Sequence, residues 1–252
     1  MRTSYKIKSS LLGLSAAIMV CTAAPALAED GDDGGISVSA NVALTSDYRF
    51  RGLSFSAGDI AVQGGIDVSH DSGFYIGTWA SSIEDSATFG HTELDLYGGW
   101  SGEVVSGLSV DVGLLYYVYP NGQGGAAGPS DYIEPYASVT GAIGPVEVTS
   151  GIAWAPSQNS LGNNDNVYIY TGVSGGIPNT PISLNATIGI NDGSLGNPAG
   201  INGVNDYVDW KIGADWAITD NLTASVAYTD TDAPSINNFT DSAVVFTLAA
   251  SF

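Results

Sequence analysis

Residues 36–252 consist of short segments in which apolar and polar side chains alternate, and this alternation limits the possible folds more than any other feature. The clearest segment alternates Ile182, Leu184, Ala186, Ile188 and Ile190 with polar or small residues. A period of two is typical of β-strands with one apolar face, whereas a helix needs apolar residues every three to four positions. No segment holds the helical pattern, so the sequence predicts an all-β protein.

The connections between these segments alternate strictly between short and long. Transmembrane barrels have this pattern, with tight periplasmic turns, longer extracellular loops and an even number of strands. The sequence therefore predicts a transmembrane antiparallel up-and-down β-barrel of twelve strands, or of ten or fourteen if a segment is divided wrongly, rather than a soluble β-sandwich. The predicted strands are 36–51, 59–70, 73–82, 92–102, 107–119, 131–143, 145–155, 166–176, 181–191, 206–218, 221–230 and 241–252.

Aromatic residues support the barrel if the apolar faces point outward and the first strand runs toward the exterior. Membrane barrels carry a belt of aromatic side chains at each interface, whereas a sandwich core would gather them near the middle of its strands. One predicted belt lies at the periplasmic ends and contains Phe74, Trp100, Trp216 and Phe252. The other lies at the extracellular ends and contains Tyr48, Phe50, Tyr116, Trp154 and Tyr228.

Residues 1–28 have the features of a cleaved secretory signal: basic residues, an apolar run and a final Ala-Leu-Ala. Cleavage would leave residues 29–252 as the barrel domain, with 26 acids against three Arg and Lys, a net charge of −23. Nucleic acid is excluded as a partner, because it binds clustered Lys and Arg. The single cysteine, Cys21, lies within the signal, so the exported chain has no disulfide; its use for lipid attachment is a weaker alternative.

The chain ends in an alternating strand whose apolar face includes Phe246, Leu248 and the terminal Phe252. A terminal aromatic on such a strand resembles the signal that the outer-membrane assembly machinery reads. Residues 41–52 (NVALTSDYRFRG) resemble the opening motif of the TorF family of porin-like proteins, also known as Gcw_chp-type conserved hypothetical outer-membrane proteins. Further similar stretches are 77–82 (GTWASS), 93–100 (ELDLYGGW), 116–120 (YYVYP) and, more loosely, 132–136 (YIEPY). This resemblance implies a pore-like protein of the bacterial outer membrane.

Strand parity places most charged side chains on the inward face, where they avoid lipid. The predicted pore-lining set is Arg49, Arg51, Asp67, Glu93, Asp95, Asp111, Glu134, Glu147, Asp209, Lys211 and Asp215. We expect Arg49 and Arg51 to pair with acids of neighbouring strands such as Glu93 or Asp95. An acid-lined narrow pore is favoured over a packed, plugged interior, because twelve strands lie between filled eight-stranded and open sixteen-stranded barrels.

The predicted function is passive diffusion of small hydrophilic solutes or ions, with a preference for cations; the alternative is a structural or adhesive outer-membrane barrel. Expected partners are outer-membrane lipid and lipopolysaccharide, the barrel assembly machinery, periplasmic chaperones and small solutes. No cofactor, metal site or enzymatic activity is predicted. The sequence 70–72 (HDS) resembles the His-x-Ser pair of barrel phospholipases, but it lies in a predicted periplasmic turn. The sequence 163–166 (NNDN) lacks the spacing of a calcium loop.

Overall fold

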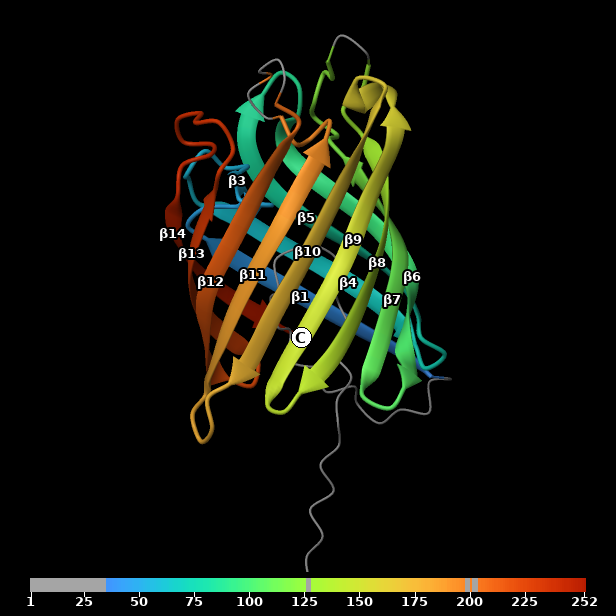
Figure 1. The fold of residues 1–252 in the computed structure, drawn as a ribbon, viewed down its shortest axis with the longest axis vertical. Coiled ribbons are helices and arrows are strands. Elements are labelled where there is room, and N and C mark those ends of the chain that lie inside the picture. The colour runs from blue at the N-terminus through green and yellow to red at the C-terminus, as the bar shows by residue number, and fades with distance from the viewer. Residues whose placement is uncertain (1–34, 126–127, 198–199, 201–203) are drawn as a thin grey trace, which may run out of the picture.

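The computed structural model describes residues 35–125, 128–197, 200 and 204–252, so the predicted signal peptide lies outside the described residues. Twelve strands form one closed barrel in the order β1-β14-β13-β12-β11-β10-β9-β8-β7-β6-β5-β4, and every neighbouring pair is antiparallel (Figure 1). The barrel strands are β1 (Ile36–Thr45), β4 (Ala61–His70), β5 (Phe74–Ser86), β6 (Gly90–Val105), β7 (Leu108–Val118), β8 (Tyr132–Ile143), β9 (Val146–Gln158), β10 (Asn164–Gly176), β11 (Ile182–Gly193), β12 (Asp206–Thr219), β13 (Leu222–Thr231) and β14 (Ala243–Ser251). The predicted fold class and strand number are confirmed.

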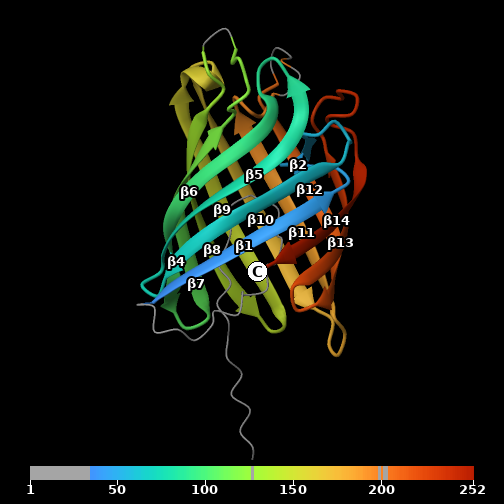
Figure 2. The ribbon, with the colours of Figure 1, turned by 180° about the vertical axis from the view of Figure 1, so that it is seen from behind.

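Two short strands, β2 (Arg49–Phe50) and β3 (Leu53–Ser54), form a separate hairpin, and the 3-10 turn η1 (Asn159–Leu161) follows β9. The barrel closes where β1 pairs with both β4 and β14, as Figure 2 shows from behind. The backbone groups of Ala40 and Phe252 exchange hydrogen bonds of 2.9 and 3.0 Å at this closure. Both the start of β1 and the end of β14 therefore lie at the end of the barrel that carries the short turns.

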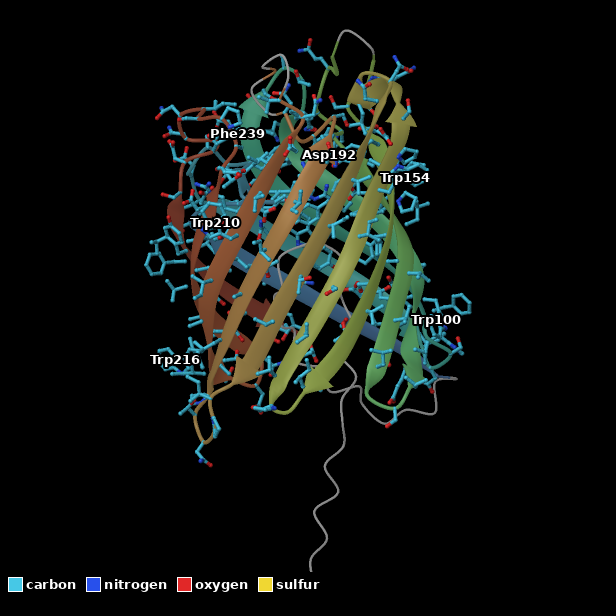
Figure 3. All side chains as sticks on the ribbon, viewed as in Figure 1. Trp100, Trp154, Asp192, Trp210, Trp216 and Phe239 are labelled. Atoms are coloured by element: carbon cyan, nitrogen blue, oxygen red, sulfur yellow. The ribbon has the colours of Figure 1, made fainter. Side chains whose placement is uncertain are left out.

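The apolar face of each strand points outward, as the period of two predicts. Ile212 and Phe246 are 62% and 61% exposed, whereas their sequence neighbours Lys211 and Val245 face inward and are less exposed. Trp100 and Trp216 project outward in the lower part of the barrel, and Trp154 and Trp210 in the upper part (Figure 3). The described residues include no helix of sufficient length and apolarity to cross a membrane.

Inward glycines let tyrosine rings lie flat against the wall. A Cβ at Gly77 would lie 2.5 Å from the Tyr97 ring, and one at Gly189 would lie 2.2 Å from the Tyr168 hydroxyl. Only glycine permits such a close approach. The lumen is therefore lined by rings whose orientation is determined by the strands themselves.

The predicted first strand, 36–51, is too long, because β1 ends at Thr45. Tyr48 and Phe50, predicted in the outer aromatic belt, are 4% and 6% exposed inside the molecule. The alternation continues past Thr45 in the sequence, but the chain leaves the sheet there. The 83–91 loop is also shorter than predicted, since β5 and β6 extend to Ser86 and from Gly90.

Candidate functional site: a loop inserted into the barrel

Residues 46–60, which connect β1 to β4, form a compact loop that is held together by its own polar groups; we call it the inserted loop. The Asp47 carboxylate accepts hydrogen bonds from the hydroxyls of Ser54 and Ser56 at 2.5 and 3.1 Å. The Tyr48 amide donates to Ser56 Oγ at 2.9 Å, and the Phe55 amide donates to the Tyr48 carbonyl at 2.7 Å. After Thr45 the backbone no longer pairs with a neighbouring strand, and these hydrogen bonds satisfy its polar groups instead.

The inserted loop contacts the inward face of strands all around the barrel. The Tyr48 hydroxyl donates to Glu93 of β6 at 2.6 Å, and its ring packs on Trp79 of β5 at 5.4 Å. Arg51 reaches Glu134 of β8 at 2.6 Å and Asn191 of β11 at 3.4 Å. Only a segment inside the lumen can contact strands on opposite sides of the barrel. Glu93, Glu134 and Asn191 lie near the ends of their strands that carry the long loops, and Trp79 lies near the middle of β5, so the inserted loop occupies the loop half of the lumen.

A tight turn brings Arg51 to the tip of the β2–β3 hairpin. Phe50 pairs with Leu53, and the two residues between them, Arg51 and Gly52, have φ of 49° and 80°. Two positive φ values are the mark of a type I′ hairpin turn, which suits Gly52 but is unusual for Arg51. A Cβ at Gly52 would lie 2.8 Å from Asp209 Cβ of β12, so the turn fits closely against the wall.

The long connection between β13 and β14 packs against the inserted loop. The Ser54 amide donates to the Phe239 carbonyl at 2.8 Å, and the Phe55 ring stacks on Phe239 at 6.4 Å. Phe239 belongs to the β13–β14 connection at the loop end of the barrel (Figure 3). Leu53, Tyr207 and Ala233 form a small buried cluster next to it.

Four buried carboxylates surround the inserted loop: Glu93, Asp95, Glu134 and Asp209. Glu93 accepts from Tyr48 and from Tyr119, at 2.6 and 2.9 Å. Asp209 accepts from Tyr168 at 3.2 Å. Neither oxygen of Asp95, which is 1% exposed, has a hydrogen-bond partner among the described residues.

Arg51 and Glu134 form an ion pair with side chains only 1% and 2% exposed. Burial opposes the charge on Arg51, but the Glu134 carboxylate raises the pKa of the guanidinium above its ordinary value. Burial and the Glu93 carboxylate likewise raise the pKa of the Tyr48 phenol, which therefore stays protonated and donates its hydrogen bond. Both side chains thus attach the inserted loop to acids of the wall.

The half of the lumen near the short turns carries a second polar layer. Tyr75 donates to Asp111 at 2.6 Å, and Tyr97 donates to Asp67 at 2.5 Å. Asp215 accepts from Asn185 and Ser225 at 2.7 and 2.6 Å. Lys211 is half-buried on the inward face near the middle of β12, and Glu147 is exposed near the turn end. No group of three or more His, Cys, Asp and Glu side chains suited to a metal occurs in the described part of the chain.

The predicted pairing of the two arginines is wrong. Arg51 pairs with Glu134, not with Glu93 or Asp95, and Arg49 pairs with Asp47 inside the loop and donates to the Asp241 carbonyl at 2.7 Å. The prediction assumed that both side chains project from a strand, whereas both belong to the inserted loop. Tyr48, Tyr119 and Asn191 were not predicted as site residues; Tyr48 belongs to the inserted loop, Tyr119 shares Glu93 with it, and Asn191 accepts from Arg51, and the alternation does not reveal the path of that loop.

The fold and interior define a class: closed antiparallel β-barrels with an apolar outer wall and a polar lumen partly filled by a loop. Within that class the chain belongs to the family described as bacterial protein of unknown function (Gcw_chp), whose model matches residues 29–252. The NanC porin has a similar fold, with TM-score 0.56 and 11% identity over 86% of this chain and 99% of that one. The KdgM porin is similar with TM-score 0.54 and 7% identity over 85% of this chain and 97% of that one. No curated protein matches the sequence.

Proposed function

We propose that this protein is a channel of the bacterial outer membrane for small hydrophilic solutes or ions, with a preference for cations. The observation that carries the proposal is the inverted polarity of the barrel. Large apolar side chains cover its outside, among them Ile76 at 65% and Val62 at 58% exposed, while carboxylates and tyrosines line the inside. Such a continuous apolar surface is stable in lipid but not in water.

The proposed location also draws on features of the sequence. Residues 1–28 read as a cleaved signal, and the TorF-type motifs and terminal Phe252 point to assembly in the outer membrane. The expected partners are therefore outer-membrane lipid, lipopolysaccharide, periplasmic chaperones and the assembly machinery. The His70–Ser72 hydrogen bond of 2.7 Å lies in an exposed turn, and we propose no catalytic role for it.

The proposed cation preference follows from the charges on the inward face. Acids outnumber Arg49, Arg51 and Lys211 there, and both arginines already lie against carboxylates. Fixed negative charge in a narrow passage with low-dielectric walls raises the local concentration of cations. We therefore propose Asp67, Glu93, Asp95, Asp111, Glu134, Glu147, Asp209 and Asp215 as the residues that set selectivity.

A second candidate is a structural or adhesive barrel with little conductance. The inserted loop favours it, because Tyr48, Phe50 and Leu53 are buried across the loop half of the lumen. The two candidates differ in one respect: a channel needs a passage that remains beside the inserted loop or opens when the loop moves, whereas a structural barrel needs none.

Planar bilayer recording of the refolded full chain tests the proposal. We expect discrete conductance steps and a reversal potential across a salt gradient that indicates cations. A variant with residues 48–57 replaced by a short Gly-Ser turn should conduct more. The absence of conductance in both the full chain and this variant would favour the structural barrel. An anion-selective reversal potential would refute the cation preference.

A further inference from the structure

Side chains from three barrel strands converge on the guanidinium of Arg51. Glu134 of β8 accepts from Nη2 at 2.6 Å, and Asn191 of β11 accepts from Nη1 at 3.4 Å. The Tyr168 ring of β10 lies under the guanidinium carbon, 4.4 Å from the ring centroid. A carboxylate, an amide oxygen and an aromatic face are the groups that recognise a planar cation.

The wall holds these three groups in place without help from the inserted loop. Tyr117 donates to the same Glu134 oxygen at 3.0 Å. Asn166 donates to Asn191 Oδ1 at 2.8 Å, and the Tyr168 hydroxyl donates to Asp209 at 3.2 Å. Tyr168 also lies flat over Gly189, as described above. The recognition site therefore belongs to the barrel, and it should persist if Arg51 withdraws.

Arg51 fills this site incompletely. The acceptors Glu134 Oε1 and Asp209 Oδ2 are buried, and neither has a hydrogen-bond partner among the described residues; the same is true of the donor Arg51 Nε. A guanidinium that is free to orient can bind a carboxylate through two parallel N–H donors, whereas Arg51 uses one. The positive φ values of the hairpin tip determine the direction from which the Arg51 side chain enters the site.

We propose that Glu134, Asn191 and Tyr168, with Asp209 beside them, form a binding site for small guanidinium-type cations, and that Arg51 is its tethered occupant. A free cation of this class competes with Arg51 for Glu134. Because Arg51 stands at the tip of the inserted loop, its displacement loosens the loop from the wall. The effect on conduction rests on the proposed channel function, but the binding site itself does not.

The test measures binding in a variant whose site is vacated. The Arg51→Ala variant of the full chain is refolded in detergent, and its thermal unfolding is followed by tryptophan fluorescence with methylguanidinium chloride at millimolar concentrations. A ligand that binds only the native state stabilises it, so a tenfold excess over Kd raises the native-to-unfolded ratio roughly tenfold. We expect this increase in the variant and a smaller one in the wild type, where Arg51 competes.

Two controls separate the site from general salt effects. Potassium chloride at equal ionic strength should not stabilise Arg51→Ala, and the Arg51→Ala, Glu134→Gln double variant should not respond to methylguanidinium. If Arg51→Ala fails to refold, Arg51→Gln, which keeps the first three side-chain carbons and removes the guanidinium, serves in its place. In the wild type, methylguanidinium should also speed hydrogen exchange at the Tyr48 and Phe55 amides of the inserted loop.

An equal response of the single and double variants, or of potassium and methylguanidinium, would overturn the site. So would the absence of any stabilisation in both Arg51 variants. The channel proposal is judged separately: if no variant conducts but methylguanidinium still stabilises Arg51→Ala, the barrel binds cations without passing them.

Discussion

Replacement of Glu134 by Gln tests whether the buried ion pair holds the inserted loop in the lumen. The two side chains are 2.6 Å apart and almost fully buried, so the change leaves the Arg51 charge without its counter-ion in a site of low dielectric. Removal of one partner from such a pair costs about 3–5 kcal/mol. The barrel strands keep their ladders, so the least costly response is for the hairpin tip to leave its site.

Hydrogen exchange can separate this local response from global unfolding. The Tyr48 and Phe55 amides are bonded within the inserted loop, whereas the Ile169 amide belongs to the ladder of β10. At one power of ten for every 1.4 kcal/mol, we expect protection of the two loop amides to fall by about two to four powers of ten. Protection of Ile169 should change much less.

Glu147→Gln is the matched control, because it removes the same charge from an exposed inward position near the short turns. It should leave the loop amides protected. Unchanged protection at Tyr48 and Phe55 in Glu134→Gln would show that the ion pair does not hold the inserted loop. An equal loss of protection in loop and strands would show that the pair stabilises the whole barrel instead.

Four further predictions concern the loop, the selectivity, the assembly and the topology. Gly52→Ala places a Cβ 2.8 Å from Asp209 Cβ at a φ of 80°, which costs about 1–2 kcal/mol for the φ alone, so it should speed exchange of the loop amides; unchanged exchange would refute the close fit. Asp95→Asn combined with Glu134→Gln should weaken cation preference in the reversal potential, and an unaltered potential would place the selective charges elsewhere. Removal of Phe252 should lower the yield of folded barrel in the outer membrane, measured by the heat-dependent shift of the band on a gel, and normal yield would refute its role. Tags in 120–130 or 192–205 should be labelled on intact cells and a tag at 220–221 should not; the reverse pattern would invert the orientation.

The barrel itself was predictable because the sequence features that determine it are local. The period of two decides which face of a strand each residue occupies, and alternate connections of a meander necessarily lie at opposite ends. Residues as distant as Phe74 and Phe246 were therefore placed outside correctly, at 64% and 61% exposed. The boundaries of β5 and β6 were less accurate, since strands can extend beyond the region where their apolar faces are needed.

The inserted loop was not predictable, because its determinants are distant in sequence. Thr45 to Arg51 continues the alternation, so the pattern alone extends the strand and points Tyr48 outward. What draws the segment inward is Glu93, Glu134 and Asn191, which lie 45, 83 and 140 residues from their partners in the loop. The local evidence was limited to polar turn formers, such as Asp47 and Ser54, that can bond their own backbone and each other.

The two arginines of residues 29–252 both lie in the loop half of the lumen, and this distinguishes it from the turn half. Of the three Arg and Lys residues after position 28, Arg51 lies against Glu134 and Arg49 against Asp47, both in the inserted loop, while Lys211 lies near the middle of β12, two residues after Asp209. The loop half therefore combines steric obstruction with charge neutralisation by Arg51, and it should determine whether solute passes. The turn half keeps Asp67, Asp111 and Asp215 hydrogen-bonded to tyrosine, serine or asparagine groups. Those bonds orient the carboxylates without cancelling their charge, so in the proposed channel they should add to the cation preference together with the acids of the loop half.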